Sequence, residues 1–392
     1  LSMLIAIDNG YQACIMAPTE ILAQQHFKTM SQELKSLNIK IDILTGSKKS
    51  KARKVLLEEL KNGDINLLIG THALLEDTVE FSNLGFVVID EQHRFGVAQR
   101  AKLWKKNKYP PHILVMTATP IPRTLSMTLY GDLDVSVIDE LPPGRKEIKT
   151  LWKSDSSRLN IIRFMHEQIK EGRQVYIVFP LIDESAKLDY KNLIEGFDSI
   201  VREFPLPDFQ VSVVHGQMKS ADKEYEMQRF VEGKTDILVA TTVIEVGVNV
   251  PNASVMVIES AERFGLSQLH QLRGRVGRGA NQSYCVLMSG HKVSVDGKTR
   301  LQTMVDTNDG FKLAEVDLKL RGPGDMMGTK QSGLLNFKIA DLIKDNKILI
   351  FAREQAQILL EDDFDLSKSE NINIARFYRP YARERMGWSR IS

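Results

Sequence analysis

Residues 87–93 read Val-Val-Ile-Asp-Glu-Gln-His, an apolar run that ends in two acidic side chains. An unbroken run of β-branched and aliphatic residues is typical of a parallel strand that is buried on both faces. We therefore expect Asp90 and Glu91 at the C-terminal edge of a sheet, where open α/β proteins bind their ligands. Taken alone, an acidic pair after a strand is more often a solvated turn, so its interpretation depends on a second motif.

Residues 268–279 provide that motif, with the sequence Gln-Leu-His-Gln-Leu-Arg-Gly-Arg-Val-Gly-Arg-Gly. Arg275 and Arg278 carry planar, permanently charged groups that match phosphate oxygens. An arginine placed at the γ-phosphate of a nucleoside triphosphate accelerates hydrolysis by about 10³–10⁵. A solvated basic helix end would require neither the glycines nor the regular spacing of the arginines. The segment therefore indicates arginine fingers.

The acids and the arginines together predict hydrolysis of a nucleoside triphosphate with Mg²⁺. Asp90 is expected to hold Mg²⁺, directly or through water, and Glu91 to orient or deprotonate the attacking water. Arg275 and Arg278 are expected to stabilise the charge that develops on the phosphate. The other predicted nucleotide contacts are Gln92, His93, Gly247 and Gln271.

The rest of the chain alternates apolar strands with helices, which favours an α/β fold with doubly wound parallel sheets. The strands predicted for a first sheet are 12–18, 39–45, 65–71, 86–90 and 113–118, and those for a second are 175–179, 210–214, 237–240, 255–259 and 283–288. Helices are predicted at 21–37, 51–61, 221–232 and 267–273. A linker rich in Pro and Gly, residues 141–146, separates the two blocks, and a mostly helical region follows residue 300.

Length and composition limit the class of protein to which these motifs belong. A chain of 392 residues is too long for one hydrophobic core, so two or three domains are expected. The net charge is only +2, so any surface for nucleic acid must be local. The two cysteines, Cys14 and Cys285, are far apart and indicate neither a disulfide framework nor a zinc site. With no signal peptide and no run of about 18 apolar residues, we expect a cytoplasmic protein without a membrane partner.

Hydroxyl groups and glycines follow the other predicted strands at the same sheet edge. Thr19 could hold a DNA phosphate through its hydroxyl and the amides of the following helix, although a plain helix N-cap explains it equally well. Thr117 and Thr119 are placed to link the acids to the DNA. The predicted DNA contacts are Pro18, Thr19, Gly46, Ser47, Thr71, His72, Thr117, Thr119, His215, Gly216, Thr241 and Thr242.

The order of these motifs is that of a superfamily 2 helicase motor, and the chain resembles the RecG family of bacterial ATP-dependent DNA branch-migration helicases along its whole length. The resemblance rests on residues 90–97, 117–125 and 268–275. Residues 321–325 and 328–333 resemble the translocation motif that this family shares with the transcription-repair coupling factor. The stretches that favour the RecG family over that relative are 129–134, 139–145 and 180–185.

The resemblance implies two RecA-like domains, 1–145 and 146–300, followed by a C-terminal region, 301–392, with a translocation hairpin and a helical tail. It implies a monomeric motor that moves on duplex DNA and remodels stalled forks and Holliday junctions, with single-stranded DNA-binding protein as a further partner. ATP is expected between the two sheets. Arg321, Gly322 and Gln331 are expected to couple cleft closure to grip on the duplex, with ordinary helix packing as the alternative.

Parts of the family pattern are missing. The phosphate-binding sequence Gly-x-x-x-x-Gly-Lys-[Ser/Thr] occurs nowhere in these 392 residues, and the N-terminal wedge domain is absent. We therefore interpret the chain as a fragment and expect it to bind ATP poorly by itself. Asn249 stands where the family more usually has Asp. A transcription-repair coupling translocase and a DNA-binding remnant that does not hydrolyse ATP remain as alternatives.

Arginines alternate with aromatic side chains from Arg376 to Arg390. This pattern can bind nucleic acid. We favour the simpler interpretation, a terminal segment that docks on the motor.

Overall fold

The computed structural model describes residues 1–46, 50–91, 102–103, 106–118, 135–138, 140, 142, 144–180, 186–241, 250–321 and 345–379, with the backbone alone at 186–192, 220, 321 and 346. Leu1–Ala118 together with Lys347–Ser392 form one compact unit, and Thr119–Asn346 form a second. The predicted domain limits at residues 145 and 300 remain predictions.

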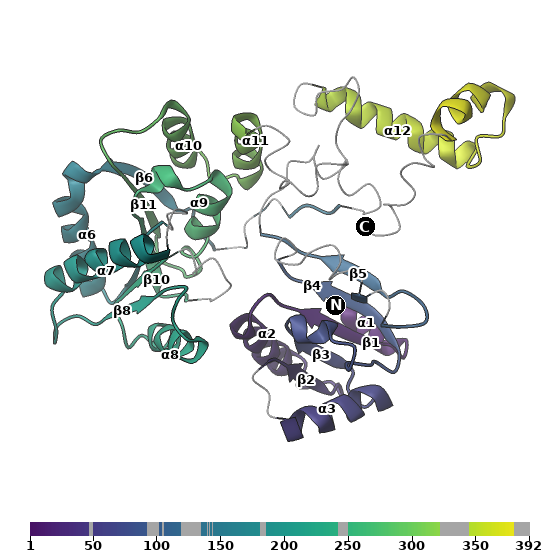
Figure 1. Cartoon of the computed structure of the whole chain (residues 1–392), viewed down its shortest axis with the longest axis horizontal. Coiled ribbons are helices and arrows are strands. Elements are labelled where there is room, and N and C mark those ends of the chain that lie inside the picture. Colours follow the sequence, from purple (N-terminus) through teal and green to yellow (C-terminus); the bar gives the residue numbers. More distant parts are fainter. Residues whose placement is uncertain are drawn as a thin grey trace. The chain divides into compact units, whose positions relative to one another are not determined.

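The first unit contains a parallel five-stranded sheet in the order β2-β3-β1-β4-β5 (Figure 1). Its strands are β1 (Gln12–Met16), β2 (Ile41–Leu44), β3 (Leu67–Gly70), β4 (Leu84–Ile89) and β5 (His112–Val115). Its helices are α1 (Ser2–Asp8), α2 (Glu20–Glu33), α3 (Ser50–Asn62) and the short η1 (His72–Leu75), with α12 (Asn346–Asp362) and η7 (Ser369–Asn371) near the C-terminus. Leu56 and Leu60 of α3 pack with Met16 and Leu68 in one buried cluster.

The second unit contains a parallel six-stranded sheet in the order β6-β11-β10-β7-β9-β8. Its strands are β6 (Lys149–Ser154), β7 (Gln174–Val178), β8 (Val211–Val214), β9 (Ile237–Ala240), β10 (Ala253–Ile258) and β11 (Tyr284–Ser289). Its helices are η3 (Asp155–Ser157), α6 (Arg158–Lys170), α7 (Ala186–Glu203), α8 (Ser220–Val231), η5 (Ala261–Arg263), α9 (Leu266–Arg273), α10 (Val295–Asp306) and α11 (Gly310–Arg321).

Helices cover both faces of the second sheet. Met165 of α6 and Phe204, which follows α7, join one buried cluster with Val175 and Ile177 of β7. Tyr176 points to the other face, where its ring lies 4.9 Å from that of Phe230 in α8. This is the doubly wound arrangement, so the predicted fold class is confirmed.

The sequence patterns missed β6, α6 and α7. In β6, which lies at the sheet edge beside β11, most side chains are exposed or half-buried. An edge strand of this kind lacks the continuous apolar run of a central strand, so it gives little signal. The ten strands that were predicted all form, most of them with ends shifted by one or two residues.

The two units repeat one structural detail at the first residue of the central strand. In β1, buried Gln12 donates through Nε2 to the carbonyl oxygens of Leu60 and Ile65, at 2.9 and 2.8 Å. In β7, buried Gln174 donates through Nε2 to those of Phe230 and Thr235, at 2.7 and 2.8 Å. Each glutamine ties the end of a helix and the following turn to the central strand, so the two sheets can be compared position by position.

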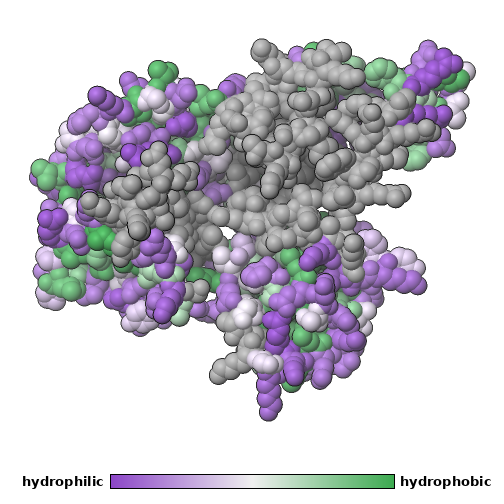
Figure 2. Space-filling model, viewed as in Figure 1, coloured by the Kyte–Doolittle hydropathy of each residue, from purple (hydrophilic) through white to green (hydrophobic). Residues whose placement is uncertain are grey.

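Hydrophilic side chains cover most of the described surface on the face shown in Figure 2, and hydrophobic ones are scattered among them. Scattered hydrophobic side chains are normal for a protein surface. Within the described residues, every helix is too short or too polar to cross a membrane.

Candidate nucleotide and nucleic-acid site

Asp90 and Glu91 follow β4 at the C-terminal edge of the first sheet. The Asp90 amide donates to the carbonyl oxygen of Met16 at 2.9 Å, which extends the strand pairing beyond β4. The Asp90 side chain is 19% exposed, and its Oδ2 lies 3.0 Å from Nε2 of His26. Glu91 has a φ of 53°, in the left-handed region that costs a non-glycine residue about 1–2 kcal/mol. Its Oε2 accepts a hydrogen bond from the Ala118 amide at 3.3 Å.

His26 was missed by the sequence analysis. It lies in α2, four residues after buried Leu22, and side chains at this spacing share one face of a helix. The helix face that packs on the sheet therefore brings His26 to Asp90. That spacing was the available signal, but a single histidine on a helix was not enough to select it.

Asp90 can bind Mg²⁺ only together with ligands from a nucleotide and from water. Within the described part of the chain, no group of three or more His, Cys, Asp and Glu side chains could hold a metal ion. Mg²⁺ in nucleotide-hydrolysing enzymes is usually held by one or two carboxylates together with substrate phosphates and water. A single, partly exposed carboxylate at the strand edge fits that kind of site.

The other predicted residues of the first unit differ in exposure. Thr19 is the N-cap of α2, and its hydroxyl accepts a hydrogen bond from the Leu22 amide at 3.4 Å, while Pro18 precedes it after β1. Thr71 follows β3 and is buried, and its hydroxyl oxygen has no hydrogen-bond partner among the described residues. The residues that are exposed at the same edge are Gly46, His72 and Thr117.

The arginine segment of the second unit divides into a buried structural residue and a charged pair. Arg273, the last residue of α9, is 2% exposed and donates through Nη1 to the carbonyl oxygens of Met304 and Thr307, at 2.8 and 2.9 Å. Those oxygens lie at the C-terminal end of α10, where a positive charge is favourable. Arg275 is buried and Arg278 is exposed, with half-buried Gln271 on α9.

Positive charge is concentrated around Arg278. Although part of Arg278 is exposed, loss of hydration at its guanidinium, and then the nearby charges of Arg275 and Arg145, lower its pKa to about 10. A bound anion would offset both the lost hydration and the repulsion between these arginines. The segment therefore has the electrostatic character expected of a phosphate-binding element.

The backbone geometry explains why glycine occupies two positions of this segment. Gly277 has a φ of 76°, and a Cβ atom on it would meet Ile148 at 2.8 Å. A Cβ atom on Gly279 would meet the Pro251 carbonyl oxygen at 2.5 Å. The glycines thus let the chain turn sharply between the two arginines and the next strand.

Strand ends of the second sheet carry the remaining predicted DNA contacts. His215 and Gly216 follow β8, and Lys223 donates to the Gly216 carbonyl oxygen at 2.8 Å. Burial and the Lys223 charge lower the pKa of His215. Thr241 follows β9 and, like Thr71, has a buried hydroxyl without a hydrogen-bond partner among the described residues. The predicted residues outside the described part are Ser47, Gln92, His93, Thr119, Thr242, Gly247, Gly322, Gln331 and the side chain of Arg321.

Comparison with known proteins identifies three segments of the chain. Residues 1–128 match the DEAD/DEAH box helicase family, residues 158–280 the helicase conserved C-terminal domain, and residues 307–392 the family described as ATP-dependent DNA helicase RecG, domain 3, C-terminal. The order of these matches agrees with two sheet domains followed by a helical region.

Individual relatives give the same result over nearly the whole chain. The chain is 52% identical to the ATP-dependent DNA helicase RecG of Synechocystis, and the match covers 95% of this chain and 44% of that protein. It is 51% identical to that of Bacillus subtilis, over 93% of its length and 53% of that protein's. The chain thus spans about half the length of the curated relatives it matches.

Solved structures agree with this relationship. The structure of RecG bound to a three-way DNA junction matches 89% of this chain and 45% of that one, with a TM-score of 0.70 and 44% identity. Yeast Dbp5 bound to RNA, at 16% identity and a TM-score of 0.55, shares the fold. Over the length that it shares with these relatives, the chain belongs to the RecG family.

Proposed function

We propose that this chain is the motor part of an ATP-dependent DNA helicase that remodels branched DNA. The observation that carries the proposal is the acid pair at the edge of the first sheet, where Asp90 is held by His26 and Glu91 by Ala118. The RecG relatives are named ATP-dependent DNA helicases, and one was solved on a three-way DNA junction. Both names agree with the chemistry that the acid pair and the arginines favour.

The described side chains divide the work of hydrolysis. Asp90 would hold Mg²⁺, which when bound neutralises phosphate charge. Glu91 orients and deprotonates the attacking water, and its contact with the Ala118 amide fixes the direction of its carboxylate. Arg275 and Arg278 stabilise charge that develops on the phosphate. Gln92, His93, Gly247 and Gln271 are proposed as further nucleotide contacts.

The Glu91–Ala118 hydrogen bond also supports a route from the nucleotide to the DNA. Ala118 lies between Thr117 and Thr119, two of the proposed DNA contacts. A change at the Glu91 carboxylate on hydrolysis would therefore act directly on a segment that touches DNA. The amides of Thr71 and Thr241 already donate to the carbonyl oxygens of Leu44 and Val214, at 3.4 and 3.3 Å, and both residues are buried. A DNA contact at these two positions therefore requires a local rearrangement. A monomeric state, a cytoplasmic location and a single-stranded DNA-binding protein partner remain predictions.

Two substitutions in the whole protein test this function. Asp90→Ala should weaken binding of the magnesium nucleotide, whereas Glu91→Gln should leave binding intact and reduce hydrolysis by orders of magnitude. Nucleotide binding can be followed with a fluorescent ATP analogue and hydrolysis by phosphate release on forked DNA. Glu33→Gln, on the exposed face of α2, is the matched control and should behave like the unmodified protein. Normal binding and normal turnover in both variants would show that the acid pair is not the catalytic centre.

A further inference from the structure

The second sheet repeats, after β10, the backbone arrangement that carries the acid pair in the first sheet. Glu259 follows β10 as Asp90 follows β4. The Glu259 amide donates to the carbonyl oxygen of Val178, the last residue of β7, at 2.8 Å, as the Asp90 amide donates to the last residue of β1 at 2.9 Å. The next residue is left-handed in both units, with a φ of 53° for Glu91 and 47° for Ser260. Glu259 and Ser260 are therefore the counterparts of Asp90 and Glu91.

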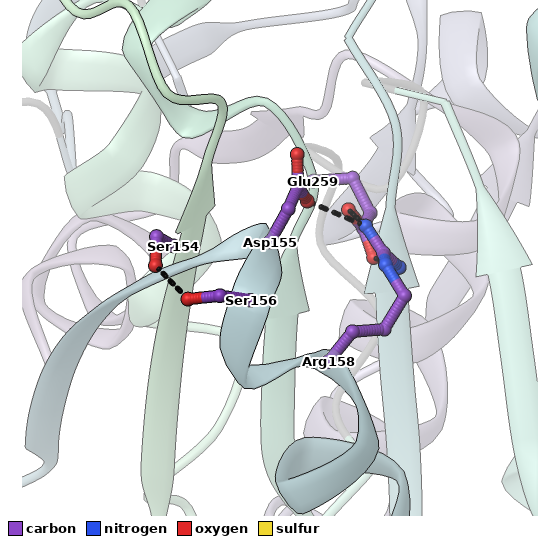
Figure 3. Close-up of polar contacts among 5 residues, drawn as sticks. All are labelled: Ser154, Asp155, Ser156, Arg158 and Glu259. Carbon is purple, nitrogen blue, oxygen red and sulfur yellow. Dashed lines mark hydrogen bonds and ion pairs between the residues drawn. The ribbon is translucent and has the colours of Figure 1, made fainter.

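The acid of the second unit is neutralised by an arginine of the same unit. Arg158, at the start of α6, donates through Nη1 to Glu259 Oε1 at 2.8 Å and through Nη2 to Oε2 at 2.9 Å. Arg158 also pairs with Asp155 at 2.9 Å, and Figure 3 shows how its side chain reaches the carboxylate of Glu259. The Glu259 side chain is only 9% exposed, and its hydrogen bonds raise the pKa of Arg158. The Arg158 guanidinium therefore stays charged across the physiological pH range.

Ser260 is held in a conformation that serine adopts at a cost. A left-handed serine persists only where its surroundings determine it. Before Ser260, Glu259 is fixed through its amide and its carboxylate. After it, the Arg263 amide donates to the Ser260 carbonyl oxygen at 3.0 Å, and Ala261 is completely buried. From this turn the chain runs through η5 and α9 to the arginines at 275 and 278.

We propose that the Arg158–Glu259 pair is a positioning device for the arginine segment. The pair anchors the left-handed turn at Ser260, and this turn sets where η5 and α9 begin. The catalytic meaning of the device rests on the proposed function of Arg275 and Arg278. In the first unit the equivalent carboxylate is proposed to face Mg²⁺, whereas in the second a permanently charged guanidinium occupies the place of a cation.

Hydrogen–deuterium exchange tests the device without any need for hydrolysis. Without Arg158, the unfavourable left-handed conformation of Ser260 should favour opening of the turn. The amides of residues 260–278 should therefore exchange about tenfold faster in Arg158→Met, a factor that corresponds to the free-energy cost of one left-handed residue. Glycine adopts this conformation freely. Adding Ser260→Gly to Arg158→Met should therefore restore most of the protection. Arg202→Met, which removes an exposed arginine of the same unit, is the matched control.

The outcomes separate positioning from general stabilisation. Unchanged exchange in Arg158→Met overturns the proposal, and so does a uniform increase across the second unit that Ser260→Gly does not rescue. If Arg158→Met does not fold, Glu259→Gln keeps one of the two hydrogen-bond acceptors, removes the charge, and should show a smaller increase confined to the same segment. In the whole protein, Arg158→Met should lower kcat for ATP with little change in KM. Should no variant or parent hydrolyse ATP, the proposed function fails while the exchange pattern still decides the positioning role.

Discussion

His270 shows how burial determines the chemistry of a single residue in the arginine segment. Burial, and then the neighbouring charge of Arg273, lower the pKa of His270 to about 4. The neutral ring can accept the hydrogen bond from Arg273 Nη2 at its Nδ1, where the two atoms are 3.1 Å apart. A charged ring would lose this bond and place two positive charges side by side. His270 is therefore a structural partner of Arg273 and not a proton carrier at neutral pH.

This depressed pKa predicts a loss of stability in acid. The unfolded chain binds a proton at His270 near pH 6.5, whereas the folded chain binds it only near pH 4. The free energy of unfolding of the second unit should therefore fall between pH 6.5 and pH 4, by up to about 3 kcal/mol, and level off below. His270→Gln keeps an acceptor for Arg273 without titrating, so its acid loss should be smaller. Denaturant unfolding, monitored through hydrogen exchange in α9, measures this pH dependence, and His291→Gln at an exposed position is the control. Equal acid sensitivity in the parent and His270→Gln would exclude this role.

At the scale of elements, the same buried glutamine organises both sheets. The Nε2 groups of Gln12 and Gln174 each satisfy two carbonyl oxygens, one from a helix end and one from the following turn. Buried carbonyl groups that lose their donors are costly, at about 1–3 kcal/mol each. The glutamines therefore connect helix, turn and central strand in a way that an apolar residue could not.

Alanine at either position should destabilise its own sheet. We expect Gln12→Ala and Gln174→Ala each to cost about 1–3 kcal/mol, because each leaves one buried carbonyl group, that of Ile65 or Thr235, without its donor. The carbonyl groups of Leu60 and Phe230 keep the amides of Gly63 and Gly233 as donors. Gln12→Ala should increase exchange in β1, and Gln174→Ala in β7. Gln357→Ala, on the exposed surface of α12, should have an effect within about 0.5 kcal/mol. A cost below about 1 kcal/mol for either buried glutamine would mean that water or a rearranged turn replaces its donors.

At the scale of the whole molecule, hydrolysis and grip on DNA should be separable. Arg278→Ala removes charge proposed to act on the phosphate, so hydrolysis in the whole protein should fall by about 10³ while DNA affinity and its salt dependence persist. Arg278→Lys should remain impaired, because lysine lacks the planar fork. Phosphate release and salt titration of DNA binding measure the two properties, with exposed Arg263→Ala as control. Parallel losses of hydrolysis and DNA affinity would place Arg278 in DNA binding.

A substitution that uncouples hydrolysis from DNA movement should have the opposite effect to Arg278→Ala. Gln331→Ala is predicted to leave hydrolysis intact and to abolish fork unwinding, because Gln331 is proposed to act on DNA movement and not on the nucleotide. ATPase and unwinding assays on the same preparation test this. If both activities fall in equal proportion in a folded variant, Gln331 belongs to the catalytic site.

The sequence by itself determined the fold class and the placement of the acid pair. Buried parallel strands require continuous apolar runs, and the residue after such a run must lie at the C-terminal edge of the sheet, so Asp90 could be placed from residues 87–93 alone. Central strands were predicted for the same reason. The edge strand β6 was not, because half-exposed side chains carry no such pattern.

Only the tertiary structure decided which side chains meet at those edges. His26 and Asp90 are 64 residues apart, and Arg158 and Glu259 are 101 apart, so no local pattern connects them. The arginines of residues 268–279 look alike in sequence, yet packing buries Arg273 against the end of α10 and leaves Arg278 exposed. Periodicity reports how one element meets the core, whereas charge pairing depends on which elements the chain brings together.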